Sequence, residues 1–308
     1  MRTLHGLEGL EAAAFRRPVV TVGTFDGLHR GHVALLEHLG RLAARMGGER
    51  LVVTFAMHPM VVIRGAPPRP LVALPRRLEG LARLGVDTAL VLPFDARLRA
   101  LTWQAFFDDI LVHELGLSAL LFGYNGNFGH GGLGTFTTVR PHAERLGVVV
   151  EEAEAVLLDG RPVSSTRIRD AIQAGDLATA ERLLGHPPAV AGPVVRGDGR
   201  GRQLGFPTAN VDTGNVVLPP AGVYEVRARV ADGTWRRAVA NLGRRPTVET
   251  AAEGTPLQLE VHLPGFDGEL YGHVLEVAFV RYLRDEQRFA DLDALVAQIR
   301  KDVARVVS

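Results

Sequence analysis

Apolar residues in the first half of the chain form short unbroken runs, and between these runs they recur at helical spacing. Short apolar runs rich in β-branched residues are typical of strands buried on both faces. The sequence predicts such strands at residues 19–22, 51–55, 88–92, 119–122 and 147–151. It predicts helices at residues 31–46, 74–84 and 103–115. Strands that alternate with helices indicate a parallel sheet covered on both faces.

The pattern changes after residue 185. A helix predicted at residues 176–184 is broken by His186, Pro187 and Pro188, and apolar and polar residues then alternate, as they do from Val226 to Val230. Such alternation is typical of half-exposed antiparallel strands. Strands are predicted at residues 190–195, 222–230, 235–240, 258–263 and 274–282. We therefore expect two domains, residues 1–185 and 186–308: an α/β domain, then an all-β domain that forms a small antiparallel barrel.

The last predicted element is a helix at the end of the barrel domain. Its apolar residues fall on one stripe: Phe289, Leu292, Leu295, Val296, Ile299 and Val303. A stripe of this kind usually packs against a core. We expect the terminal helix to contribute core packing through it.

Composition narrows the classes of protein to consider. The 308 residues are 46% hydrophobic and 22% charged, which suits two ordinary globular cores. A net charge of +1 gives no general attraction to nucleic acid or to a membrane surface. The absence of cysteine excludes disulfides, thiolate metal sites and a cysteine nucleophile. We expect a cytoplasmic protein with no signal peptide and no membrane span; the sequence leaves open whether it forms a homo-oligomer.

The most informative stretch is GTFDGLHRGH at residues 23–32, directly after a predicted strand. His29 and His32 lie where the following helix begins, and the N–H groups of a helix N-terminus attract phosphate. A lone histidine there would more often be an ordinary solvated residue, but strand, glycines, paired histidines and helix together favour an anion site. The stretch resembles the signature of nucleotidyltransferases; it is neither a P-loop nor a dinucleotide fingerprint.

Two later segments carry residues suited to the same ligand. Ser164-Ser165-Thr166-Arg167 precedes a predicted helical stretch, where hydroxyls and a guanidinium can hold phosphate oxygens. An ordinary helix cap is the alternative. The glycine-rich loop at residues 122–134 offers Tyr124 and Phe128 as stacking faces and Asn125 as an amide. A surface loop without a ligand is the alternative there.

Together these segments resemble the adenylyltransferase half of the bifunctional bacterial riboflavin kinase/FAD synthetases. The resemblance implies a Rossmann-like nucleotidyltransferase domain that transfers AMP from Mg-ATP to FMN, with His29 and His32 in catalytic roles. It implies that ATP and its phosphates lie against Gly23, Phe25, Asp26, Gly31, Ser164, Ser165, Thr166 and Arg167. It implies that the nucleotide or flavin lies against Phe55, His58, Tyr124, Asn125 and Phe128.

The chain departs from that family at two points. Family members usually carry Arg or Lys in the glycine-rich loop after Phe-Gly, whereas this loop has His130 among glycines. The segment TFAMHP at residues 54–59 keeps Phe55 and His58 but lacks the proline that usually precedes the histidine.

The second half contains its own candidate site. Residues 192–210 combine a loop rich in glycine and arginine with a Pro-Thr-x-Asn sequence. Thr208 and Asn210, one residue apart on an extended segment, point the same way and offer two oxygens to Mg²⁺. A basic turn that only solvates a hairpin is the alternative. Glu260 lies between Leu259 and Val261, so it is either a solvent-facing strand residue or a carboxylate retained for chemistry.

These segments resemble riboflavin kinase from about Gly192 to the terminal helix, above all in LGFPTAN at residues 204–210. By this resemblance Glu260 is the catalytic base, and Thr208 and Asn210 bind Mg²⁺. The resemblance also implies that ATP or flavin contacts Gly197, Gly199, Gly201, Arg202, Gly205, Pro207 and Arg284. A base is needed because the riboflavin hydroxyl is a poor nucleophile, whereas the FMN phosphate is already ionised, with a second pKa of about 6.

The sequence thus predicts a transferase with two activities and the small-molecule substrates ATP, riboflavin and FMN, with Mg²⁺ as cofactor. It predicts no nucleic-acid partner. Two alternatives stay open: a riboflavin kinase whose first domain has lost adenylyl transfer or transfers another nucleotide, and a flavin- or RNA-binding regulator without turnover. The altered glycine-rich loop motivates the first. The retained Glu260, Thr208 and Asn210 count against the second, because a binding protein needs no base.

Overall fold

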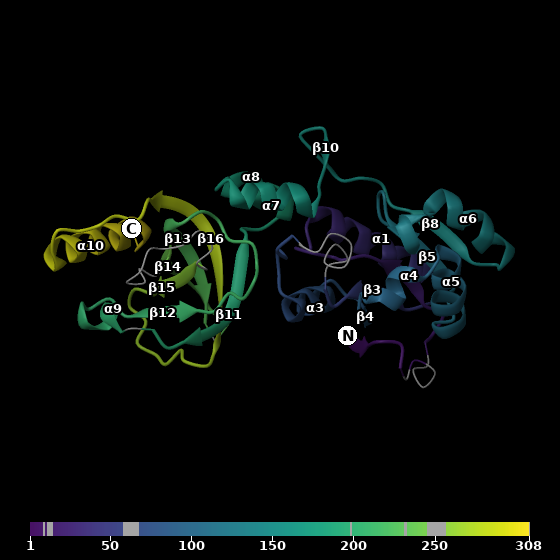
Figure 1. Ribbon diagram of the computed structural model, residues 1–308, viewed down its shortest axis with the longest axis horizontal. Coiled ribbons are helices and arrows are strands. Elements are labelled where there is room, and N and C mark those ends of the chain that lie inside the picture. Colours follow the sequence, from purple (N-terminus) through teal and green to yellow (C-terminus); the bar gives the residue numbers. More distant parts are fainter. Residues whose placement is uncertain are drawn as a thin grey trace. The chain divides into compact units, whose positions relative to one another are not determined.

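The structure is a computed structural model of the chain. It describes residues 1–8, 10, 15–57, 68–197, 199–230, 233–244 and 257–307. The chain divides into two compact units, Met1–Ser165 and Thr166–Ser308. Figure 1 colours the first unit from purple to teal and the second from teal to yellow.

The first unit is built on a six-stranded sheet whose neighbouring strands all run parallel. In spatial order the strands are β1 (Arg2–His5), β4 (Thr88–Leu92), β3 (Arg50–Phe55), β2 (Val19–Val22), β5 (Ala119–Phe122) and β8 (Val149–Glu152). Every strand predicted for this half is present, with ends within two residues of the prediction. The sequence does not predict β1, because this short edge strand is mostly exposed and has no buried apolar run.

Helices cover both faces of this sheet, as the prediction requires. They are α1 (Arg30–Met46), α3 (Leu74–Arg83), the π-helix η2 (Phe106–Glu114) and α6 (Phe136–Arg145). On one face of the sheet, leucines of α1 and α3 pack against Val19 and the other strand residues that point to this face. On the opposite face, aromatic and aliphatic residues of η2 and α6 pack against Val20 and the strand residues that point the same way. Successive strand residues point to opposite faces, so both layers are needed to bury them.

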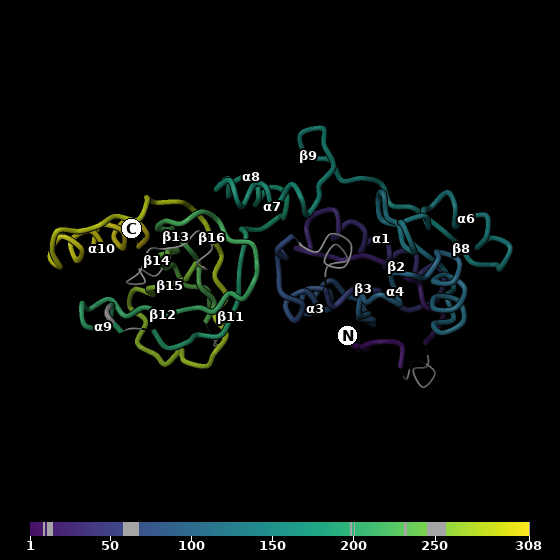
Figure 2. The backbone as a smooth tube through the Cα atoms, viewed as in Figure 1, coloured from purple at the N-terminus to yellow at the C-terminus, as the bar shows by residue number. Residues whose placement is uncertain are grey.

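One region of this unit differs from the prediction. The helix expected at residues 103–115 is a single turn, α5 (Trp103–Ala105), that continues as η2. The sequence misses α6, because threonines and Pro141 dilute its apolar spacing, although Thr135 and Thr138 form a capping box at its start. The short elements are α4 (Ala96–Ala100), β6 (Asn127–Phe128), η3 (His130–Gly132), β7 (Gly134–Thr135), β9 (Leu157–Leu158) and β10 (Arg161–Pro162). Figure 2 shows the hairpin formed by β9 and β10.

The order of the strands determines where a ligand can bind. From the central β2 the chain proceeds to β3 and β4 on one side, and it later returns to the other side of β2 with β5. Ligands of open parallel sheets bind outside the carboxyl ends of the strands at such a reversal. The histidine-containing turn follows β2 and the glycine-rich loop follows β5, so both lie at this point of the sheet.

The second unit contains a closed barrel of six antiparallel strands (Figure 1). In spatial order they are β11 (Ala189–Val195), β12 (Thr208–Val211), β15 (Gln258–His262), β14 (Trp235–Gly243), β13 (Gly222–Arg229) and β16 (Val274–Arg284). Its helices are α7 (Ser165–Gln173), which begins at the unit boundary, α8 (Leu177–Leu184), α9 (Arg200–Gln203) and α10 (Leu292–Val307). The predicted order of an α/β fold, a small antiparallel barrel and a terminal helix is confirmed.

The prediction for the terminal helix is only partly right. Phe289 precedes α10, and Leu292 is 65% exposed, while Leu295, Val296, Ile299 and Val303 are half-buried. The buried residues of α10 are Asp302 and Val306. The apolar stripe does not complete a core; part of it lines a cavity on the outside of the barrel, described below.

A substitution at one glycine tests how closely the barrel is packed. If Gly192 in β11 carried a Cβ atom, this atom would lie 1.7 Å from the backbone carbonyl oxygen of Asp212. A backbone atom cannot move aside easily. We expect Gly192→Ala to destabilise the protein by about 1 to 3 kcal/mol. The same substitution at Gly40, inside α1 with 3.7 Å to the nearest atom, should stabilise it by up to about 1 kcal/mol. Calorimetric unfolding of the full chain measures both changes, and an unchanged Gly192→Ala transition would contradict the packing described.

Candidate active sites

The first candidate site is the turn that connects β2 to α1. His29 is the N-cap of α1, and its Nδ1 accepts a hydrogen bond from the backbone N–H of His32 at 3.3 Å. The two imidazole rings stack with their centroids 3.7 Å apart. Gly23, Phe25 and Gly31 lie in the same stretch, and Phe25 adopts a left-handed backbone with a φ of 50°. A non-glycine residue in this conformation costs roughly 1 to 3 kcal/mol, so its surroundings must hold it.

Two buried charged residues hold this turn in place. The Asp26 carboxylate accepts hydrogen bonds from the backbone N–H groups of residues 71 and 72 at 2.9 and 3.2 Å. Arg77 of α3 donates to the carbonyl of Thr24, and at 3.0 Å to that of Phe55. Asp26 and Arg77 are 3% and 7% exposed, and their opposite charges attract. One guanidinium thereby ties the histidine turn to the end of β3.

The surroundings of His32 determine its protonation. Burial lowers the pKa of His32 well below its usual range, and His29 and Arg77 lower this pKa further. Its Nδ1 is buried and has no hydrogen-bond partner among the residues that the structure describes. A neutral imidazole carries one N–H donor. At neutral pH His32 can therefore offer a hydrogen bond but not a positive charge.

The predicted phosphate-binding segment, Ser164-Ser165-Thr166-Arg167, begins next to this turn. Ser165 is the first residue of α7, and its Oγ donates to the backbone carbonyl of Asp26 at 2.8 Å. Ser164 directly precedes the helix. Thr166 and Arg167 lie inside its first turn rather than ahead of it, so the helix begins earlier than the sequence pattern indicates. The predicted contact of Asp26 with ATP stays a prediction, because its carboxylate accepts hydrogen bonds from the backbone N–H groups of residues 71 and 72 here.

The glycine-rich loop borders a cavity of about 280 Å³ in the first unit. The cavity is walled by the aromatic residues Phe55, Phe94, Phe106 and Phe128, and its polar lining residues are Arg99, Asn127 and His130. No carboxylate belongs to the described lining. The His130 backbone N–H donates to the Leu101 carbonyl at 2.7 Å, which fixes the loop against the segment that carries Arg99.

The residues predicted to contact the nucleotide or flavin in this half are not all equivalent. Phe55 and Phe128 line the cavity, but Phe128 is buried and stacks on Phe122 at 5.5 Å between centroids, so it is a core residue rather than an open stacking face. Tyr124 and Asn125 are exposed outside the cavity lining. His58 lies outside the described residues.

The second candidate site is a row of polar residues across three neighbouring strands of the barrel. Glu260 in β15 is paired in register with Asn210 in β12 on one side and with Asn241 in β14 on the other. Leu259 and Val261 point into the barrel core, so Glu260 and its paired residues face outward. Glu260 is nevertheless only half-exposed.

A cavity of about 380 Å³ explains that partial burial. It lies between the outer face of the barrel and α10, and its polar and charged lining residues are Thr208, Asn241, Glu260, His262, Arg284, Glu286, Gln287 and Asp302. Its apolar lining includes Leu204, Phe206, Phe289, Leu295 and Ile299. Glu260 therefore faces a partly apolar cavity rather than open solvent.

A second barrel cavity of about 360 Å³ adjoins the first. Thr208 lines both cavities, and Arg202 and Pro207 line only the second. Apolar groups of Phe266, Leu270 and Tyr271 form much of its wall. Two cavities that meet at a hydroxyl are suited to two substrates that react with each other.

The donors around Thr208 and Asn210 fit a hard cation. Both side chains are half-buried and alternate with buried residues of β12, so they point the same way as predicted. A Cβ on Gly197 would lie 2.2 Å from the Asn210 amide, so the loop backbone passes directly over this side chain. Hydroxyl, amide and carboxylate oxygens suit Mg²⁺, which also takes ligands from substrate phosphates. Among the described residues no cluster of three or more His, Asp or Glu side chains could hold a metal alone.

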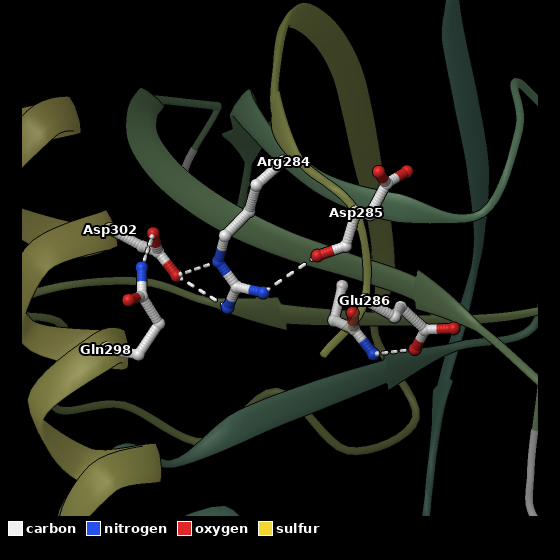
Figure 3. A network of polar contacts seen from close by, with 6 residues as sticks. Arg284, Asp285, Glu286, Gln298 and Asp302 are labelled. Atoms are coloured by element: carbon white, nitrogen blue, oxygen red, sulfur yellow. Dashed lines mark hydrogen bonds and ion pairs between the residues drawn. The ribbon is translucent and has the colours of Figure 1, made fainter. Parts of the chain in front are cut away.

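The other glycines and the arginine predicted for this site are distributed around the cavities. Gly201 lines the larger cavity, whereas Gly199 and Gly205 lie on either side of α9 outside both linings. Arg284 lines the larger cavity, but its guanidinium is bonded to Asp302 of α10 and to the Asp285 carbonyl (Figure 3).

Comparisons with known proteins match the two parts of the chain to two different families. The family described as FAD synthetase matches residues 11–167, and the family described as riboflavin kinase matches residues 184–308. A bifunctional riboflavin kinase/FMN adenylyltransferase of Pseudomonas fluorescens is 42% identical over 304 residues, covering 99% of this chain and 96% of that protein. This chain belongs to the bifunctional riboflavin kinase/FMN adenylyltransferase family.

Further relatives extend the likeness over the whole chain. The family member of Escherichia coli K12 is 39% identical over 98% of this chain and 96% of its own length. A crystal structure described as a macrolide-efflux protein from Streptococcus pneumoniae has a TM-score of 0.87 and 27% identity, covering 100% of this chain and 99% of that one. None of the described helices is long and apolar enough to cross a membrane.

Several residues of the two sites cannot be identified from the sequence alone. Arg77 and Arg99 lie on helices remote in sequence from the glycine-rich motifs, and only the fold brings them to the site. Asp302 belongs to none of the sequence motifs, and it lies within an amphipathic helix where a polar residue is common.

The environment of His32 predicts its behaviour with pH. The unfolded chain takes up a proton on this ring near pH 6.5, whereas the folded chain does not. The free energy of unfolding should therefore fall as the pH drops below about 6.5, because the unfolded state then binds more protons. Titration of the ring by NMR, with the resonance assigned through His32→Gln, should place its midpoint clearly below 6.5. A midpoint at or above that value would contradict the buried, neutral ring.

Proposed function

We propose that this chain converts riboflavin to FAD in two ATP-dependent steps, each at its own site. The barrel phosphorylates riboflavin to FMN, and the parallel-sheet domain transfers AMP from ATP to FMN with release of pyrophosphate. The observation that carries the kinase assignment is Glu260, which lines the larger barrel cavity together with Thr208, the residue common to both cavities. We assign residues 186–308 to the kinase domain and residues 1–185 to the adenylyltransferase domain, with the boundary at the end of α8.

In the kinase site Glu260 is the general base. The attacking group is a terminal hydroxyl of riboflavin, which must lose its proton as it attacks the γ-phosphate of ATP. A carboxylate within hydrogen-bond reach of that hydroxyl accepts the proton as the new O–P bond forms and the bond to the ADP leaving group breaks. The cross-strand partners Asn210 and Asn241 restrict the position of Glu260, because both lie directly beside it in register.

The two barrel cavities suit the two substrates. The larger one, with Phe206, Phe289, Leu295 and Ile299 in its wall, suits the flat apolar ring of riboflavin. The adjoining one, lined by Arg202 and the Pro207-Thr208 turn, suits ATP. Transfer then takes place near Thr208, the residue common to both. Gly197, Gly199, Gly201 and Gly205 allow the loop backbone to approach the phosphates closely.

The metal assignment follows from the donor set. Thr208 and Asn210 would hold Mg²⁺ through their side-chain oxygens, and the phosphates of ATP would supply further ligands. When bound, Mg²⁺ neutralises the negative charge that develops on the transferred and leaving phosphates.

The adenylyltransferase site needs no base. Its nucleophile is the FMN phosphate, which is already ionised at neutral pH, so the protein's task is to align the reactants and stabilise the leaving pyrophosphate. His29 and His32 at the start of α1, together with Ser164, Ser165, Thr166 and Arg167 at the start of α7, supply donors and a cation for this purpose. Because His32 is neutral, the positive charge comes mainly from Arg167 and the helix N-termini.

The aromatic cavity at the glycine-rich loop suits the flavin ring of FMN. Phe55 borders it, and Arg77 ties the Phe55 carbonyl to the histidine turn, so the cavity and the turn keep a fixed spacing. Arg99 gives its polar side a positive charge where the loop itself lacks Arg or Lys. Tyr124, Asn125 and His58 stay assigned to the nucleotide or flavin. An enzyme with these substrates is expected to act in the cytoplasm.

Reciprocal variants test the two-site proposal. Glu260→Gln should lower FMN formation from riboflavin by about a hundredfold or more, because proton transfer is lost, and leave FAD formation from FMN unchanged. The double variant His29→Ala and His32→Ala should do the reverse. Chromatography of the flavins formed from riboflavin and, separately, from FMN measures both rates. Loss of both activities from either change, in protein that remains folded by circular dichroism, would contradict separate sites.

One alternative has an observation in its favour. The glycine-rich loop lacks the Arg or Lys usual in the family, which favours a kinase whose first domain no longer adenylates FMN. The same chromatography distinguishes it: the parent protein would then form FMN from riboflavin and leave added FMN unchanged.

A further inference from the structure

Arg284, at the end of β16, joins the barrel to the C-terminal helix (Figure 3). Its Nε and Nη2 donate to one carboxylate oxygen of Asp302 at 2.9 and 2.8 Å, and its Nη1 donates to the Asp285 carbonyl at 2.9 Å. The other oxygen of Asp302 accepts a hydrogen bond from the Gln298 side chain at 2.9 Å. All three nitrogens of the guanidinium and both oxygens of the carboxylate thus form hydrogen bonds with protein groups.

This ion pair is buried. The side chains of Asp302 and Arg284 are 2% and 14% exposed. Each charge has lost most of its water and depends on the other for compensation, so removal of one partner leaves an uncompensated charge in the protein. A pair of this kind tolerates little displacement, because its hydrogen bonds require one geometry.

Few other buried contacts fix α10. Its buried residues are Asp302 and Val306, and Val306 lies in the last turn, where Arg237 of β14 donates to its carbonyl at 3.0 Å. Ile299 and Leu295, one and two turns before Asp302, are half-buried and line the larger barrel cavity. Of the two buried residues, Asp302 is therefore the one nearer to the part of α10 that forms the cavity wall.

We propose that Arg284 and Asp302 are positioning residues for riboflavin: their ion pair holds α10 as one wall of the flavin cavity, opposite Glu260. This inference rests on the proposed kinase function. Arg284 acts on the substrate through the helix, because its guanidinium is directed to Asp302. Without the pair, α10 pivots about Val306, the wall formed by Leu295 and Ile299 moves outward, and riboflavin loses contact on one side.

Asp302→Asn tests the pair, since it keeps the shape of the side chain and removes its charge. We expect the KM for riboflavin to rise about tenfold or more while the KM for ATP changes less than twofold, because only the flavin wall moves. FAD formation from FMN should be unchanged. Amide hydrogen exchange should accelerate at residues 292–301 and not in β12, β14 or β15.

A matched control lies on the same strand. Arg281 of β16 pairs with Glu225 of β13 at 2.8 Å, and neither residue belongs to the lining of the two barrel cavities described above. Glu225→Gln should leave both KM values unchanged. Arg284→Lys, which keeps the charge but not the two-pronged hydrogen bond, provides a milder second variant should Asp302→Asn fail to fold. It should raise the KM for riboflavin in the same direction.

The outcomes separate this inference from the function on which it rests. An unchanged KM for riboflavin in both variants, or equal increases for riboflavin and ATP, would overturn the positioning role. If the parent protein forms no FMN, the kinase proposal fails, and hydrogen exchange still decides whether the pair holds α10. Faster exchange confined to α10 supports the tether, and unchanged exchange overturns it.

Discussion

A buried arginine beside a carboxylate supports the site in each half of this protein, and the rest of each site depends on that arrangement. In the first half Arg77 and Asp26 hold the backbone of the turn that presents His29 and His32. In the second half Arg284 binds Asp302 and joins α10 to the barrel. Buried charges are costly unless they are compensated, so both arrangements resist displacement. Each fixes the position of one element, a turn in the first half and a terminal helix in the second.

The two halves meet different chemical demands with different architecture. An alcohol must lose its proton as it attacks a phosphate, and the barrel places a carboxylate, Glu260, in the lining of its larger cavity. An ionised phosphate needs no base, and the parallel sheet provides helix N-termini and donors around a turn instead. This difference explains why the sequence of the second half holds a strand carboxylate between apolar neighbours, while the first half concentrates glycine, histidine and hydroxyl residues at loop-to-helix junctions.

Periodicity predicts most of the fold here, and it fails where contacts are distant in sequence. Alternation in β15 correctly implies that Glu260 faces away from the core, but it cannot show that α10 covers that face. The apolar stripe of α10 indicates burial, yet the buried residues of this helix are Asp302 and Val306, neither of which belongs to that stripe. Phe128 looks like an open aromatic in a loop and is a core residue. Arg77 and Arg99 carry no local signal, since their roles arise only from the packing of helices beside loops far along the chain.

The central claim is that one chain performs both steps, each at its own site. Incubation of the purified protein with Mg²⁺ and ATP, starting once from riboflavin and once from FMN, tests this most directly when the flavins are separated by chromatography. The account predicts FAD from both starting materials, with FMN as an intermediate in the first. Accumulation of FMN from riboflavin together with unchanged FMN in the second incubation would contradict it.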